Sequence, residues 1–120
     1  MTKTSLRALF AVCVLSALTG CGAMHESMHE LEHHYIAARN HAGVAAYAKA
    51  DAEALEVEAI VNSDAVARAN DDPRFVELHA ELVTKLGGLR KALAAEDAEQ
   101  TQAAFEATSD SCRACHAEYR

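Results

Sequence analysis

Residues 72–93 read DPRFVELHAELVTKLGGLRKAL, and this stretch decides the fold class. Its large apolar side chains recur at spacings of three and four residues, which is the period of one face of a helix. They are Phe75, Leu78, Leu82, Leu86, Leu89 and Leu93. Asp72 suits the N-cap and Pro73 the first helical position, because a proline there gives up an N–H that has no helical partner. The stretch therefore predicts a long helix that buries one apolar face against other helices.

The segment before residue 44 predicts a first helix, from residue 24 or 27 to residue 42. Ser27 and Glu30 fit a capping box that would start the helix near Met28, and Gly43 suits the position after its end. The predicted inner face contains Met24, Met28, Leu31, Tyr35, Ala38 and Ala42. This stripe is of the kind found in helix bundles.

Two more helices complete the set. A second helix is expected over about residues 44–62, with Tyr47, Ala50, Ala54, Val57 and Val61 on its inner face. The last helix begins after Asp97, an N-cap with Gln100 three residues on. Its predicted inner face contains Ala98, Thr101, Phe105, Thr108, Cys112, Cys115 and Tyr119. With one proline and no alternating apolar run, the chain is predicted to be all-α: an antiparallel up-down-up-down four-helix bundle.

The last helix ends in the motif Cys112-Arg113-Ala114-Cys115-His116. The spacing Cys-x-x-Cys-His is the attachment signature of a c-type haem. Two thiols add to the vinyl groups of the porphyrin, and the neighbouring imidazole coordinates the iron. On a helix the three side chains lie at i, i+3 and i+4 and share one face. The motif predicts one covalent haem c, bound by Cys112 and Cys115, with His116 as an axial ligand.

A methionine of the first helix is the candidate for the sixth iron ligand, because that helix starts at the end of the bundle where the last helix finishes. By axial rise alone, Met24 is more nearly level with His116 than Met28 is. Side chains lean toward the N-terminus of their own helix, however, so Met28 and His116 converge in an antiparallel pair. We predict Met28 as the ligand and Met24 as the runner-up, with a histidine or an open position as the alternatives.

A stripe of histidines occupies another face of the first helix. His25, His29 and His33 recur every four residues, with glutamates between them. Such a stripe can hold Zn²⁺ or Cu²⁺, and it can equally be a solvated surface. A divalent-metal binding or sensing lipoprotein is therefore one alternative function.

Residues 1–20 are predicted to be a lipoprotein signal peptide. Lys3 and Arg7 form a short basic start, and an uncharged apolar run follows that is too short to span a bilayer. The run ends in Leu-Thr-Gly-Cys, which resembles a lipobox, so Cys21 is predicted to carry the lipid. Cys13 then leaves with the signal peptide. Each of the remaining cysteines has a predicted role that suits an exported, oxidising compartment.

The mature chain is predicted to have a lipidated N-terminus and tether at residues 21–26 and a cytochrome domain at residues 27–120. The expected location is the periplasmic face of a bacterial membrane. Gly22 follows the lipidated cysteine where inner-membrane retention is associated with aspartate, which favours the outer membrane.

The charge balance excludes one class of partner. Residues 1–20 hold two basic residues and no acidic one, so their removal takes the formal net charge from −7 to −9. A nucleic-acid-binding protein needs a basic footprint, which this chain lacks. An acidic surface suits a basic redox partner.

No nucleophile–base set or pair of catalytic carboxylates stands out, so no enzymatic activity is expected. The sequence does not set the oligomeric state.

The motif, followed by Tyr119-Arg120 on the last helix of an acidic exported bundle, resembles the class II cytochromes c, which comprise cytochrome c′ and its low-spin, methionine-ligated relatives. The resemblance implies thioether bonds at Cys112 and Cys115 and a proximal ligand at His116, and it makes Met28 similar to the first-helix methionine of the low-spin members. The short mature chain and the lipid anchor depart from the family, which puts the dimer of cytochrome c′ in doubt.

These expectations converge on a membrane-anchored protein that transfers single electrons. The nearest alternative is a five-coordinate haem protein that binds NO or another diatomic gas. A thiol oxidoreductase using the same two cysteines lacks the strand context that such enzymes show.

Overall fold

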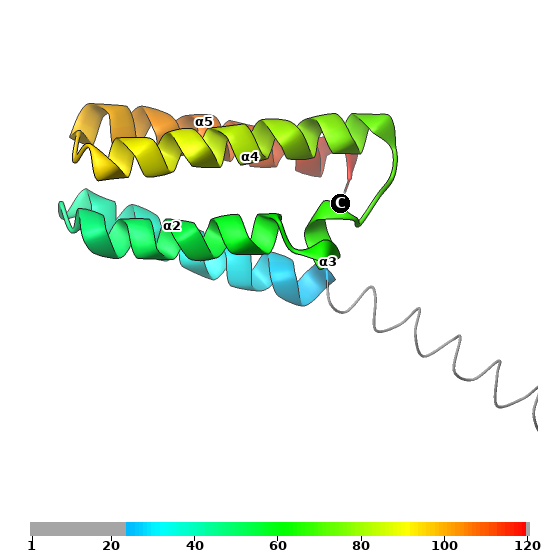
Figure 1. The fold of residues 1–120 in the computed structure, drawn as a ribbon, viewed down its shortest axis with the longest axis horizontal. Helices are drawn as coiled ribbons and strands as arrows, with labels where there is room; N and C mark the ends of the chain where they lie inside the picture. Colours follow the sequence, from blue (N-terminus) through cyan, green and yellow to red (C-terminus); the bar gives the residue numbers. More distant parts are fainter. Residues whose placement is uncertain (1–23, 120) are drawn as a thin grey trace, which may run out of the picture.

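The computed structural model describes residues 24–119, which form helices joined by short connections (Figure 1). A first helix covers residues 24–43. It is followed by α2 (Tyr47–Val61), the one-turn α3 (Asp64–Ala67), α4 (Pro73–Ala94) and α5 (Ala98–Glu118). The predicted signal segment and the lipidation site Cys21 lie outside the described residues.

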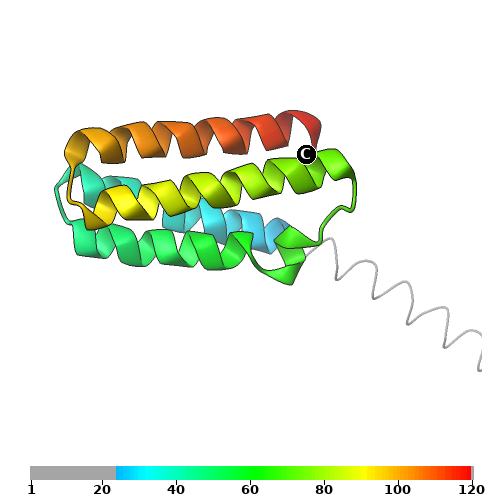
Figure 2. The ribbon, with the colours of Figure 1, turned by 45° about the horizontal axis from the view of Figure 1, so that its top comes forward.

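The four long helices form the predicted antiparallel up-down-up-down bundle. Figures 1 and 2 show α4 beside α5 and the first helix beside α2. Polar contacts join the other neighbours: Tyr35 of the first helix bonds to Ser109 of α5, and Arg90 of α4 pairs with Asp51 of α2. The start of the first helix, α3, the start of α4 and the end of α5 therefore lie at one end of the bundle (Figure 1).

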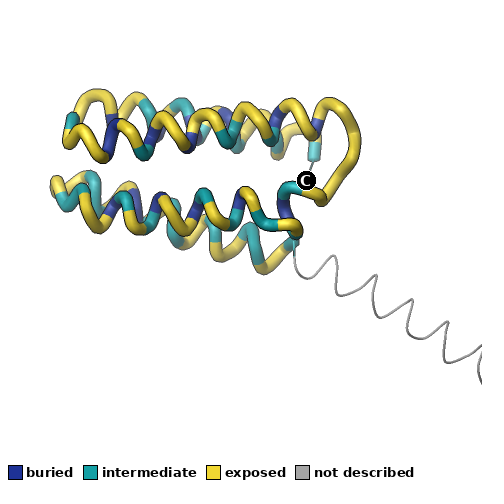
Figure 3. Tube along the Cα trace, viewed as in Figure 1, coloured by how far each residue is buried: buried dark blue, intermediate teal, exposed yellow. Residues whose placement is uncertain are grey.

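The core lies between the helices and follows the predicted apolar stripes. Figure 3 shows the buried positions on the sides of the helices that face one another. Leu78, Leu86, Leu89 and Leu93 are each at most 1% exposed, and Ala50, Ala54, Val57 and Val61 of α2 are each at most 2% exposed. Burying one leucine contributes about 2 kcal/mol relative to leaving it exposed. Among the described residues, the stripe of α4 thus supplies the four largest fully buried side chains.

Two of the predicted helix starts are confirmed by side-chain caps. The Asp72 carboxylate accepts a hydrogen bond from the N–H of Arg74, with Pro73 at the first helical position. The Asp97 carboxylate accepts a 2.8 Å bond from the N–H of Gln100. Each cap satisfies one N–H that the first turn of a helix leaves without a partner.

The predicted span of the first helix, from residue 24 or 27 to residue 42, is close to the observed residues 24–43, but both of its predicted caps were wrong. Ser27 lies inside the helix, since residues 24–26 are already helical, so it is not the N-cap of a helix that starts at Met28. Gly43 is still helical, and the left-handed residue of the following turn is Ala45, with φ 58°. The N–H of Ala46 reaches back to the carbonyl of His41 over 2.8 Å, which sets the reversal two residues later than glycine preference suggests.

Gly87 and Gly88 do not interrupt α4. Both are exposed, and a methyl group added at either would meet no atom within 4 Å. They therefore mark neither a break nor a close approach of another segment of the described chain. Within residues 24–119, no helix combines the length and apolar character that a membrane crossing requires.

Candidate haem site

The Cys-x-x-Cys-His motif occupies the last two turns of α5. The cysteines are free thiols and partly buried, while His116 is exposed. The buried line of α5 runs through Thr101, Phe105, Thr108 and Ser111. The cysteines therefore flank the centre of the inner face instead of continuing it, and Ala98 was wrongly placed on that face because it is exposed.

Hydrogen bonds of Tyr35 join the first helix to α5 just before the motif, at Phe105 and Ser109, and this contact is called the Tyr35 clamp. The hydroxyl of Tyr35 donates to the carbonyl oxygen of Phe105 over 2.8 Å and lies 2.7 Å from Oγ of Ser109. A tyrosine hydroxyl has one hydrogen, so the Ser109 hydroxyl donates to Tyr35. The rings of Tyr35 and Phe105 also meet edge to face, with centroids 5.6 Å apart. The clamp therefore fixes both the distance and the register between these two helices.

Burial of the clamp is reflected in the pKa of Tyr35. Burial raises this pKa above its ordinary value, and the Ser109 hydrogen bond and nearby arginines lower it in part. The charge of a Cys112 thiolate would also raise this pKa.

The register of the clamp relates the two predicted iron ligands. Met28 precedes Tyr35 by seven residues, and His116 follows Ser109 by seven residues. Seven residues are almost two helical turns, about 10 Å of axial rise with nearly the same direction around the axis. Because the helices are antiparallel, both steps lead toward the same end of the bundle. Met28 and His116 thus occupy equivalent positions across the interface, and Met24 lies one further turn outward.

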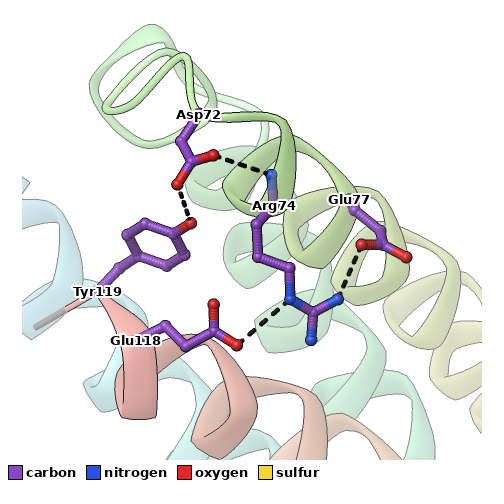
Figure 4. Close-up of polar contacts among 5 residues, drawn as sticks. All are labelled: Asp72, Arg74, Glu77, Glu118 and Tyr119. Carbon is purple, nitrogen blue, oxygen red and sulfur yellow. Dashed lines mark hydrogen bonds and ion pairs between the residues drawn. The ribbon is translucent and has the colours of Figure 1, made fainter.

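A second set of contacts holds the end of α5 against the start of α4 (Figure 4). The Tyr119 hydroxyl donates to the Asp72 carboxylate over 2.5 Å, and Arg74 donates to Glu118 over 3.3 Å and to Glu77 over 2.8 Å. The rings of Phe75 and Tyr119 meet edge to face at 5.3 Å. The turn that carries His116 is therefore fastened on its far side as well.

This end of α4 is in turn joined to α2. The ring of Phe75 stacks on that of His79, with centroids 6.4 Å apart. Nε2 of His79 lies 2.8 Å from the carbonyl oxygen of Val61, the last residue of α2. The contacts pass from the end of α5 through the start of α4 to the end of α2.

The cysteine thiols are not activated as a redox pair would be. Burial raises the pKa of Cys112 above its usual value, with a smaller contribution from Cys115, and burial also raises the pKa of Cys115. A catalytic Cys-x-x-Cys lies at a helix N-terminus, where the dipole stabilises the thiolate. This motif lies at a helix C-terminus, where the dipole has the opposite effect.

The donor set fits a covalently attached haem. Two thiols one helical turn apart and an adjacent imidazole are the groups that such an attachment uses, and among residues 24–119 no hydrogen bond engages the His116 ring. The Ser111 hydroxyl, beside Cys112 in the sequence, is buried without a hydrogen-bond partner in the described chain, and Ser111 is only 8% exposed. Cys112, Cys115 and His116 would hold the group, and the group would supply the redox-active iron.

The histidine stripe does not form a preassembled metal site. His25, His29 and His33 are exposed on one helix, and within residues 24–119 no three metal-binding side chains converge. From His25 to His33 the axial rise is about 12 Å, which is too far for three imidazoles of one helix to reach one ion. The next histidine, His34, faces α2 and lies 2.5 Å from the Glu53 carboxylate.

Several residues that shape the site were not predicted to form polar contacts between helices. Tyr35 was assigned to the apolar stripe, and Ser109, Asp72 and Tyr119 were not linked to any partner across helices. The one signal in the sequence was a tyrosine on the predicted inner face of the first helix and another on that of the last helix, since a buried tyrosine hydroxyl usually has a hydrogen-bond partner. Which partner it has depends on how the helices pack.

The bundle and its motif define a c-type haem protein of the four-helix kind. Residues 18–120 match the family model described as Cytochrome C', so the chain belongs to the cytochrome c′ family of class II c-type cytochromes and carries covalently bound haem c. No curated protein and no solved structure matches the chain significantly.

Proposed function

We propose that this protein is an exported, membrane-anchored cytochrome that transfers single electrons, with His116 and Met28 as the axial ligands of its haem iron. The family match establishes a c-type haem protein, a class that includes both electron carriers and gas-binding proteins. The nature of the sixth position separates these two functions, because a methionine there raises the reduction potential and closes the iron to small ligands.

The observation that carries the proposal is the register of the Tyr35–Ser109 contact. It supports Met28 over Met24, because one and the same seven-residue step leads from Tyr35 to Met28 and from Ser109 to His116. Met24 and Met28 are both partly buried, so the register and not the burial separates them. Burial raises the pKa of both Cys112 and Cys115, whereas a catalytic redox pair has a lowered pKa, which argues against the thiol oxidoreductase alternative.

The cellular setting rests on the N-terminal segment. A signal peptide over residues 1–20 and a lipid on Cys21 would tether the bundle to the periplasmic face of a membrane, with Gly22 favouring the outer membrane. Cytochrome c′ family proteins are typically periplasmic, which agrees with this setting. We further propose a basic redox protein as the partner, because the chain has a formal net charge of −7. No enzymatic role is proposed.

Absorption spectra of the purified holoprotein in both redox states test the iron ligands. The expected result is a low-spin spectrum with the weak far-red band of a methionine-ligated ferric haem. That band should disappear in Met28→Ala and persist in Met24→Ala, which serves as the matched control. A high-spin spectrum that neither substitution changes would refute methionine ligation and favour a five-coordinate haem that binds NO or another diatomic gas.

A further inference from the structure

We infer that Tyr35 and Ser109 are positioning residues that hold Met28 opposite His116 and so decide whether the sixth position of the iron is closed. This inference rests on the proposed function, because it concerns the same axial pair. Neither residue belongs to the attachment motif, and Tyr35 stands in a sequence stripe that reads as apolar.

The clamp is suited to this role by its geometry. Tyr35 makes one bond to the backbone of α5, at the Phe105 carbonyl (2.8 Å), and one to a side chain one turn later, at Ser109 (2.7 Å). Both bonds meet at the Tyr35 hydroxyl, so together they hold one point of the first helix against α5 and oppose sliding along it. A slide by one turn would break both bonds and move each residue of the first helix by about 5.4 Å.

The rest of the interface does not supply the same restraint. The first helix packs on the core through Leu31, Ala38 and Ala42, and apolar contacts of this kind are not directional. His34 and Glu53 do join the first helix to α2, but that contact lies on another side of the helix from Met28. Between the first helix and α5, the Tyr35 clamp is the set of hydrogen bonds in the described chain that fixes which residues face each other.

The consequence concerns Met24 as well as Met28. With the clamp closed, the same seven-residue step leads from the contact to Met28 on the first helix and to His116 on α5, and Met24 is one turn beyond Met28. Without it, the thioether of Met28 is within bonding distance of the iron in only a fraction of the molecules. An added ligand then competes for the iron more easily, because its apparent affinity depends on the fraction of molecules with an open position.

The test measures the affinity of the ferric holoprotein for added imidazole, together with unfolding by urea. Tyr35→Phe removes the hydroxyl and keeps the ring contact with Phe105, so it isolates the two hydrogen bonds. We expect imidazole to bind about tenfold more tightly to Tyr35→Phe than to the wild type, from the net strength of two hydrogen bonds. Ser109→Ala, which removes one of the two bonds, should give an intermediate increase.

Asp51→Asn is the matched control. It weakens the pairing of Asp51 with Arg90 (3.1 Å) between α2 and α4, an interface that contains neither Met28 nor His116. Asp51→Asn should lower stability and leave the imidazole affinity within twofold of the wild type. Equal shifts in Tyr35→Phe and Asp51→Asn would assign the effect to general destabilisation and overturn the inference, as would an unchanged affinity in Tyr35→Phe.

Met28→Ala separates the inference from the proposed function. If Met28→Ala binds imidazole much more tightly than the wild type and Tyr35→Phe does not, Met28 is the ligand and the positioning role alone is refuted. If Met28→Ala has no effect, methionine ligation fails and the positioning role fails with it. An increase in both Met28→Ala and Tyr35→Phe, with none in the Asp51→Asn control, supports the two together.

Discussion

The hydroxyl of Tyr119, just after the last turn of α5, donates a 2.5 Å hydrogen bond to the same Asp72 carboxylate that caps the start of α4. The Asp72 carboxylate thus caps the start of α4 and also binds the residue that follows α5, the helix that carries the haem motif. The contact shifts both groups: it lowers the pKa of Asp72 and raises the pKa of Tyr119 to about 12.

Tyr119→Phe tests this contact through its pH dependence. The stabilising effect of the bond requires a charged Asp72 and a neutral Tyr119. It should therefore be complete at neutral pH, decline on the acid side as the pH falls through the lowered pKa of Asp72, and decline on the alkaline side between pH 10 and about 12. The measurement is the difference in Tm between wild type and Tyr119→Phe across this range. A difference that stays constant from neutral pH to pH 12 would mean that the bond contributes nothing to stability.

Removing the attachment residues should separate covalent binding from iron ligation. Cys112→Ala together with Cys115→Ala should leave no haem on the polypeptide after denaturation, because both thioether bonds are gone. His116→Ala should retain covalent haem and lose its native spectrum. The check is haem staining of a denaturing gel combined with absorption spectra of the native proteins. Covalent haem in the double cysteine variant would contradict the assignment.

Two buried threonines of α5 form a natural comparison. Thr101 is 3% exposed and its hydroxyl has no partner in the described chain, whereas the Thr108 hydroxyl donates to the Ala104 carbonyl over 2.8 Å. Because an unpaired buried hydroxyl costs about 1 kcal/mol or more, Thr101→Val should raise the free energy of unfolding by about 1 kcal/mol. Thr108→Val should leave it unchanged or lower it. Urea unfolding of the two holoproteins checks the sign, and a loss of stability in Thr101→Val would contradict the prediction.

Gly88 offers a second route to stabilisation. It is exposed inside α4, and an added methyl group would meet no atom within 4 Å. Since glycine in a helix interior costs about 1 kcal/mol relative to alanine, Gly88→Ala should stabilise the bundle by up to about that amount. The readout is the urea midpoint at an unchanged m-value. A loss of stability, or a change in oligomeric state measured by light scattering, would instead indicate that Gly88 contacts another molecule.

The amino-acid sequence by itself determined the helices and their inner faces. Leu78, Leu86 and Leu89 were predicted to be buried, and they are, because a period of 3.6 residues leaves one apolar face that must leave water. Asp72 and Asp97 were predicted as caps for an equally local reason, since a carboxylate three residues or fewer from an N–H depends on no distant segment. The haem motif is local in the same sense, because five consecutive residues supply all its donor atoms.

Only the tertiary structure decided which side chains meet across the bundle. Tyr35 and Ser109 are 74 positions apart, and Asp72 and Tyr119 are 47 apart, so their pairing depends on the relative sliding of packed helices. Apolar stripes restrict that sliding weakly, because the same stripe packs acceptably in several registers. A hydrogen bond of 2.7 Å forms in one register only, because its length and angle tolerate little change. For this reason the sequence placed both Met24 and Met28 near the haem motif and preferred Met28 only from the lean of its side chain, whereas the Tyr35–Ser109 contact adds a reason from the observed register.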